Sequence, residues 1–185
     1  MLREELVSQL VDAFRLYGYD GASLSCLSKV TGLGKTNLYH YFPGGKEEMA
    51  KAALERVNTW LETCILQPLR SKAAPLDKLQ VMCDQVIKFF NEGQNSCLWA
   101  VLALERSSSD LFHSQIKLAL TQWIDAITAV LEEAGLETQL ARHRAEDAIL
   151  RIQGALVLAR GLDNTTPFQR TMQTLTSDLL EPKLG

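Results

Sequence analysis

The chain has 185 residues, of which 46% are hydrophobic and 22% charged, and its formal net charge is −3. This composition is that of an ordinary globular protein, and it excludes an intrinsically disordered chain and a generally basic nucleic-acid binder. The apolar runs are far too short to span a bilayer, and the N-terminus lacks the pattern of a secretory signal. We therefore expect a cytoplasmic protein with no membrane partner.

The first 45 residues predict three short helices. Apolar residues at helical spacing over 6–17 indicate a first helix, which Gly18 ends. Ser23 suits the N-cap of a second helix, and Gly32 ends it. A third helix is expected over 35–41.

Six further helices follow, because apolar residues recur at helical spacing and no stretch alternates like a strand. They are expected at about 46–67, 76–90, 97–106, 110–134, 139–160 and 167–181, with Ser109 or Asp110 capping the fourth of these and Thr166 the last. The predicted fold is all-α with about nine helices, divided into an N-terminal helix-turn-helix domain (1–45) and a larger helical domain (46–185).

Residues 21–46 contain no Asp or Glu, although acids outnumber bases over the whole chain. This window holds Lys29, Lys35, His40 and Lys46, so an approaching polyanion meets no carboxylate. Two short helices around a glycine turn are the geometry of a helix-turn-helix that reads DNA. The window therefore predicts a head that binds double-stranded DNA.

An ordered set of residues extends this pattern over roughly 50 positions: Ala13-Phe14, Tyr17-Gly18-Tyr19, Ser23-Leu24, Val30 to Lys35, Leu38 to Phe42 and Lys46-Glu47-Glu48. This set resembles the DNA-binding head of the tetracycline-repressor (TetR) family of bacterial regulators. The resemblance implies a subunit of nine or ten helices that forms a two-fold dimer through its last two helices. It also implies that each head reads half of a palindromic operator, and that a small molecule entering the body weakens DNA binding.

The third helix begins with Lys35, Thr36 and Asn37, which we expect to reach base edges in the major groove. The alternative is a solvated helix start. By the resemblance, Tyr39 faces the groove while His40 and Tyr41 lie nearer the phosphates, although one tyrosine can instead pack under the head.

Three more residues are candidates for phosphate contacts. The resemblance places Lys46 at the start of the fourth helix, where a lysine and free backbone N–H groups meet a phosphate. Ser23 and Thr31 can add hydrogen bonds to phosphates, but helix capping and turn formation explain them equally well.

The body contains aromatic and polar residues that the resemblance makes candidates for the pocket of an unidentified small molecule. Ordinary core packing is the alternative for the aromatic ones. The candidates are Trp60, Met82, Phe89, Phe90, Trp99, Glu105, His113, Trp123 and Gln153.

The last two helices are expected to form the homodimer interface, with packing on the subunit's own core as the alternative. The expected interface residues are Ala148, Ile152, Ala155, Ala159, Phe168, Met172 and Leu175.

Cysteine 97 stands at the start of a helix, where the helix dipole can increase thiolate reactivity. Cys97 is therefore a candidate sensor of electrophiles or oxidants, with a buried, inert thiol as the alternative. The four cysteines and three histidines lack the spacing of a metal site, so we expect no metal and no cofactor.

The function predicted from these features is a ligand-responsive transcriptional regulator, most simply a repressor. One alternative is a redox or electrophile sensor that acts through Cys97. The second is a helical protein-interaction module that does not bind DNA. We expect no enzymatic activity, because the sequence lacks a phosphate-binding loop, a nucleophile elbow and paired catalytic histidines.

Overall fold

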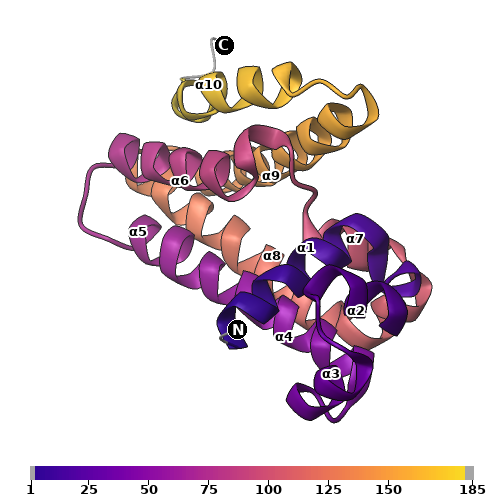
Figure 1. The fold of residues 1–185 in the computed structure, drawn as a ribbon. Coiled ribbons are helices and arrows are strands. Elements are labelled where there is room, and N and C mark those ends of the chain that lie inside the picture. The colour runs from indigo at the N-terminus through magenta and orange to yellow at the C-terminus, as the bar shows by residue number, and fades with distance from the viewer. Residues whose placement is uncertain (1–2, 182–185) are drawn as a thin grey trace. The chain divides into compact units, whose positions relative to one another are not determined.

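The computed structural model describes residues 3–181, which form helices and no strand, as predicted. None of these helices combines the length and hydrophobicity needed to cross a membrane. In chain order (Figure 1) the elements are α1 (Arg3–Gly21), α2 (Leu24–Thr31), α3 (Lys35–Tyr41), α4 (Gly45–Trp60), the π-helix η1 (Leu61–Leu66), α5 (Gln67–Leu69), α6 (Pro75–Phe89), the 3₁₀ helix η2 (Asn91–Gly93), α7 (Leu98–Leu104), α8 (Arg106–Glu133), α9 (Thr138–Gly161) and α10 (Thr166–Leu180).

The helices group into two compact units. The head unit contains the chain up to residue 60 together with 97–117, and the body unit contains 61–96 together with the chain from 118 onward. The head unit extends past residue 45 because α4 packs along α1 and α7 packs against both. The division into functional domains at residue 45 stays a prediction.

The second helix follows the predicted capping pattern. The hydroxyl of Ser23 accepts the N–H of Cys26 at 3.2 Å, and Gly32 ends α2 in the left-handed region (φ 68°). The expected stop at Gly18 is instead a break inside α1, where φ is 68° and ψ is −179°. The side chains of Leu27 and Leu38 are fully buried and fix α2 and α3 to the head unit.

The predicted helix over 46–67 is divided into α4, η1 and α5. Pro68 has no N–H, and its ring would clash with the carbonyl of Cys64 in a regular α-helix. The wider turns of η1 directly precede this proline and relieve the clash.

Two predicted caps were wrong. Helix α8 begins at Arg106, ahead of both expected caps. The N-cap position of α10 is Thr165, one residue before Thr166, and its side chain makes no capping hydrogen bond. Serines and threonines are so frequent around both helix starts that composition could not select the true caps.

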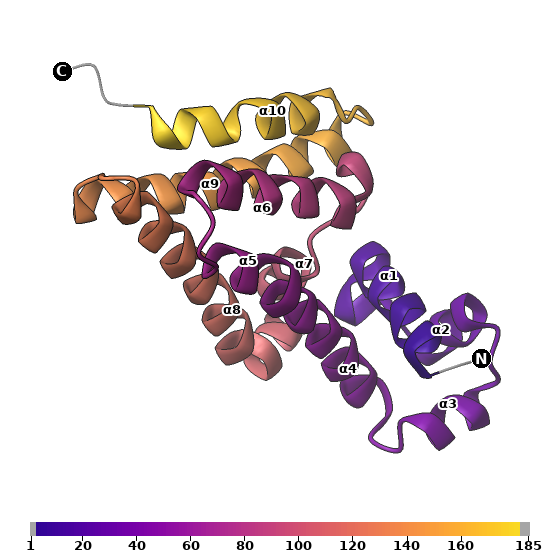
Figure 2. The ribbon, with the colours of Figure 1, turned by 90° about the vertical axis from the view of Figure 1, so that its left-hand side faces the viewer.

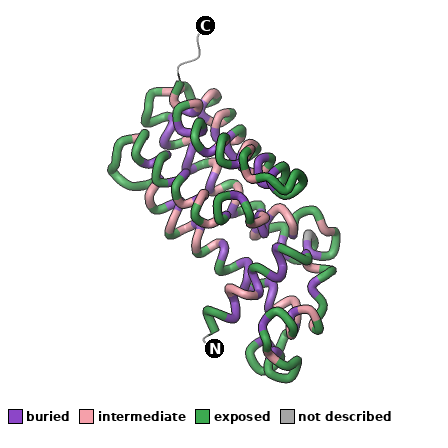
Figure 3. The backbone as a smooth tube through the Cα atoms, turned by 45° about the horizontal axis from the view of Figure 1, so that its top comes forward, coloured by how far each residue is buried: buried purple, intermediate pink, exposed green. Residues whose placement is uncertain are grey.

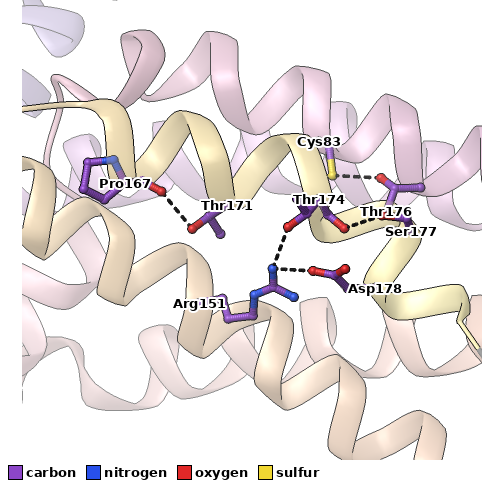
Figure 4. A network of polar contacts seen from close by, with 8 residues as sticks. All are labelled: Cys83, Arg151, Pro167, Thr171, Thr174, Thr176, Ser177 and Asp178. Carbon is purple, nitrogen blue, oxygen red and sulfur yellow. Dashed lines mark hydrogen bonds and ion pairs between the residues drawn. The ribbon is translucent and has the colours of Figure 1, made fainter. Parts of the chain in front are cut away.

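In the body unit, α6, α9 and α10 lie side by side (Figures 1 and 2). Their buried sides face one another, and the outer sides of α9 and α10 are exposed (Figure 3). Arg151 of α9 donates to Asp178 of α10 at 2.6 Å, and buried Cys83 of α6 contacts the hydroxyl of Thr176 of α10 at 3.3 Å (Figure 4). Apolar packing and these polar contacts together hold the three helices.

Candidate nucleic-acid interface

The start of α3 presents polar side chains to solvent. Lys35, Thr36 and Asn37 are exposed, whereas the next residue, Leu38, is fully buried. Because one buried leucine fixes the helix, the three residues before it are free to meet a ligand. Base contact by these residues stays a prediction.

The turn between α2 and α3 is held by side-chain hydroxyls. Ser28 donates to the carbonyl of Leu33 at 2.6 Å. Thr31 donates to the carbonyl of Leu27 at 2.8 Å and accepts the N–H of Leu33 at 3.3 Å. Thr31 is only 5% exposed, so its hydroxyl serves the turn, which is the structural alternative to the phosphate contact. Ser23 is exposed and caps α2, so its phosphate contact stays a prediction.

The aromatic residues of α3 all lie at the surface. Tyr39, His40 and Tyr41 are exposed, and the rings of His40 and Tyr41 meet edge to face with centroids 5.9 Å apart. Neither tyrosine packs under the head. Phe42 takes that place, fully buried with the guanidinium of Arg3 5.4 Å from its ring centroid.

Lys46 is half-buried and already has partners. Its ammonium donates to the carbonyl of Tyr19 at 3.0 Å and lies 4.4 Å from the centroid of the Tyr19 ring. The N–H of Gly44 donates to Glu48 at 2.6 Å, and that of Gly45 to the carbonyl of Phe42 at 2.9 Å. These two N–H groups are therefore bonded within the head. The phosphate contact of Lys46 itself stays a prediction.

Tyr19 is the centre of a small aromatic and charged cluster. Its ring lies 6.3 Å from Phe14 and 5.8 Å, edge-on, from Phe112. Burial, together with the nearby carboxylates of Glu47 and Asp20, raises the pKa of its hydroxyl. The Tyr19 side chain is therefore neutral at physiological pH.

The structure divides the nine pocket candidates between the two units. Trp60, Trp99, Glu105 and His113 belong to the head unit, whereas Met82, Phe89, Phe90, Trp123 and Gln153 belong to the body unit.

The four fully buried candidates are packed against neighbours. Trp99 donates its indole N–H to Asn58 at 3.0 Å, and Trp123 donates to the sulfur of Met82 at 3.4 Å. Phe90 packs its ring edge-on against Phe168. These contacts are those of ordinary core, so a pocket formed by the candidates stays a prediction.

Among the polar candidates, Glu105 has a definite position that the sequence did not reveal. Its carboxylate accepts the N–H of Tyr19 at 2.6 Å, and so belongs to the support of the head. His113 is exposed on α8 and Gln153 is half-exposed on α9. Glu105 and Tyr19 are 86 positions apart in the chain, so their hydrogen bond could not be predicted from the sequence.

All seven residues expected at the dimer interface are covered by the chain's own core, with exposures of 5% or less. They lie on the faces of α9 and α10 that pack on the subunit's own core, which is the alternative to the dimer interface, and their contact with a second copy stays a prediction. The exposed apolar residues of α9 are instead Leu150, Val157 and Leu158. Both sides of α9 are therefore apolar, one covered by the subunit's own core and the other exposed.

Cys97 is 4% exposed and forms the N-cap of α7. The guanidinium of Arg15 lies near enough for their charges to interact, a basic neighbour that the sequence around Cys97 does not contain. Burial lowers the pKa of Arg15. Because so little of the Cys97 thiol meets solvent, sensing of electrophiles by Cys97 is not favoured.

Comparison with known proteins identifies the chain's relatives. Residues 75–174 match the family model described as "Transcriptional regulator LmrA/YxaF-like, C-terminal domain". The chain is 26% identical over 168 residues to the HTH-type transcriptional regulator LmrA of Bacillus subtilis, covering 89% of each protein. It is 24% identical over 169 residues to the uncharacterized regulator YxaF of the same organism, covering 89% of this chain and 88% of YxaF.

Solved structures agree on the fold. A TetR transcriptional regulator from Legionella pneumophila superposes with a TM-score of 0.81 at 19% identity, covering 96% of this chain and 97% of that one. NemR of Escherichia coli in its reduced form superposes with a TM-score of 0.73 at 22% identity, covering 95% of each chain. The family model, these relatives and the helix-turn-helix show that the chain belongs to the TetR family of DNA-binding transcriptional regulators.

Proposed function

We propose that the protein is a cytoplasmic repressor that binds a palindromic operator as a homodimer and is released by a small molecule. The observation that carries the proposal is the acid-free segment 21–46, in which the start of α3 exposes Lys35, Thr36 and Asn37 together. Lysine can donate to guanine O6 and N7, asparagine can pair with adenine, and the threonine methyl can meet the methyl of thymine.

Dimerisation supplies the affinity that one head lacks. The head has few positive charges, so each head neutralises few phosphates and binds weakly alone. Two heads held by a two-fold axis meet half-sites about 34 Å apart on one face of the duplex. A palindromic operator follows from that symmetry.

The proposed dimer surface is the outer side of α9. Leu150 and Val157 are 68% and 67% exposed, and Gly154 and Gly161 alternate with them at helical spacing. A Cβ built on either glycine would have no neighbour within 4 Å, so the chain's own packing does not require these glycines. A glycine inside a helix costs about 1 kcal/mol relative to alanine, and close approach of a second helix offsets that cost. A second copy of α9 is the occupant that this surface fits.

The small molecule is proposed to bind the body unit, to which most of the residues matched by the LmrA/YxaF-like model belong. One open groove of about 650 Å³ lies between α5, α6 and α8, and another of about 570 Å³ lies along α9 and α10. Both volumes are in the range of sites for small molecules. The first groove combines apolar Leu69 and Val130 with charged Arg70, Lys78 and Glu133.

Selection of bound sequences from a random DNA pool tests the proposal. We expect recovery of an inverted repeat whose half-site centres are about one helical turn, or a multiple of it, apart. Repeating the selection with a library of small molecules should identify one that releases the DNA. Recovery of no common sequence, or of a single half-site bound by a monomer, would contradict the proposal.

A further inference from the structure

Glu105 occupies a one-residue elbow between α7 and α8. Its backbone is extended (φ −91°, ψ 129°), so α7 ends before it and α8 begins directly after it. The hydroxyl of fully buried Ser108 donates to the carbonyl of Leu102 at 2.7 Å and lies 3.2 Å from the carbonyl of Glu105. The elbow is therefore fixed by its own hydrogen bonds.

The carboxylate of Glu105 is directed at the end of α1. One oxygen accepts the N–H of Tyr19 at 2.6 Å, a short bond of the strong, charge-assisted kind. The other oxygen would lie 2.1 Å from a Cβ built on Gly18, where φ is 68°. A glycine at this position thus makes room for the carboxylate. Ser107 adds a second link by donating to Asp20 at 2.6 Å.

Tyr19 contacts both Glu105 and Lys46. The backbone N–H of Tyr19 binds Glu105, while its carbonyl accepts the ammonium of Lys46 at 3.0 Å. The Tyr19 ring lies under the same ammonium, 4.4 Å away. A lysine has four flexible side-chain bonds, so these contacts decide where its charge is held.

We propose that Glu105 is a positioning residue for DNA binding: its carboxylate fixes Tyr19, and Tyr19 holds the Lys46 ammonium in place for a phosphate. The inference rests on the proposed phosphate contact of Lys46. It makes a prediction opposite in sign to simple electrostatics. Removing an acid from a DNA-binding unit should strengthen binding to a polyanion, whereas removing Glu105 should weaken it.

Affinity for an operator fragment tests the proposal in the full-length protein. Glu105→Ala should weaken binding roughly tenfold, because a charge-assisted hydrogen bond is lost. Glu105→Gln keeps a neutral acceptor and should lose roughly threefold, since neutral hydrogen bonds are about half as strong. Glu55→Ala removes the same charge from an exposed position on α4 and should bind as well as the wild type or better.

Two further measurements separate positioning from a general loss of structure. In the Lys46→Ala background, Glu105→Ala should change affinity by less than about twofold, because contacts in one network are not additive. The chain has four tyrosines, so labelling with ¹⁵N-tyrosine gives four amide signals. The Tyr19 amide should exchange with solvent faster in Glu105→Ala while Tyr39 and Tyr41 are unchanged, and Glu105→Gln keeps this test available if the alanine variant unfolds.

The outcomes distinguish two kinds of failure. If Lys46→Ala leaves the affinity unchanged, the phosphate contact of Lys46 is wrong. If Lys46→Ala weakens binding but Glu105→Ala behaves like Glu55→Ala, or adds its full effect in the Lys46→Ala background, the positioning role of Glu105 is overturned.

Discussion

Arg151 of α9 donates to the carboxylate of Asp178 of α10 at 2.6 Å and to the hydroxyl of Thr174 at 3.0 Å (Figure 4). The hydrogen bond from Arg151 is the main reason that the pKa of Asp178 lies below its ordinary value. This pair joins α9, which carries the proposed dimer surface, to α10. Because the pKa of Asp178 is shifted, the contribution of the pair can be measured from how stability depends on pH.

The pKa of Asp178 is lower in the folded protein than in the unfolded chain. Its contribution to stability is therefore present above the unfolded value of about 3.9 and is lost as pH falls through the folded value. We expect Asp178→Asn to lower the free energy of unfolding at pH 7 by less than about 1 kcal/mol, because the pair is partly exposed. Denaturant melts at pH 7 and pH 2 should show the difference shrinking in acid. If the loss of unfolding free energy in Asp178→Asn is the same at pH 2 as at pH 7, the ion pair is not its cause. Asp147→Asn, which changes an exposed aspartate on α9, is the control.

Lys46→Ala should weaken binding to all DNA sequences about equally, because a phosphate contact carries no base information. The dependence of affinity on salt should also become less steep, by about one unit of slope per dimer half. Gel shifts over a salt series with operator and unrelated DNA measure both effects. Lys51→Ala, an exposed change of equal charge on the same helix, is the control. If Lys46→Ala weakened binding to the operator but not to unrelated DNA, Lys46 would contact bases and not a phosphate.

Asn37→Ala and Lys35→Ala should instead change which sequence is preferred. Each lost base contact is expected to cost roughly 1–3 kcal/mol at the matching base pair and little elsewhere. Repeating the random-pool selection with each variant shows which position of the half-site becomes relaxed. An unchanged preference in both variants would show that the start of α3 does not read bases.

Val157→Glu should dissociate the proposed dimer, because it places like charges opposite each other across a two-fold axis. Sedimentation at micromolar concentration should then show a monomer with the same helix content. Leu76→Glu changes an exposed leucine on α6, away from the outer side of α9, and this variant should remain dimeric. A Val157→Glu protein that still sediments as a dimer would exclude the outer side of α9.

Gly18→Ala should destabilise the protein more than Gly32→Ala. Both glycines have a φ of 68°, but a Cβ at Gly18 meets Glu105 while a Cβ at Gly32 meets nothing within 4 Å. The ψ of −179° at Gly18 is also nearly exclusive to glycine, so we expect a cost of about 2–3 kcal/mol against about 1 kcal/mol at Gly32. Thermal melts compare the two variants. In the Glu105→Ala background, Gly18→Ala should destabilise the protein less, because the carboxylate that clashes with the new Cβ is gone. An unchanged destabilisation would mean that it comes entirely from the backbone conformation at Gly18.

The local parts of the fold were predictable from the sequence. The range of α3 and the capping of α2 by Ser23 and Gly32 agree with prediction because short-range hydrogen bonds and glycine conformations determine them. The start of α8 at Arg106 was not predictable, because it follows the extended residue Glu105 directly and no serine or threonine marks that position.

The contacts that hold the candidate site were beyond prediction. Glu105 and Lys46 meet at Tyr19 from positions 86 and 27 residues away, and no local pattern marks such a meeting. Which side of α9 is exposed was beyond prediction for a different reason. Ile152 and Val157 are both apolar, and only the packing of α10 decides which of them is buried.

The π-helix η1 also affects how this chain should be aligned with its relatives. A π turn takes up about one residue more than an α turn, so a turn of the kind found in η1 can accommodate a one-residue insertion without forming a loop. A relative with a regular α-helix here would lack one residue between 61 and 66. An ungapped alignment through this stretch would then pair buried Leu69 with a residue one position away from its structural counterpart in that relative. Sequence comparisons within the family should therefore place single-residue gaps inside this helix.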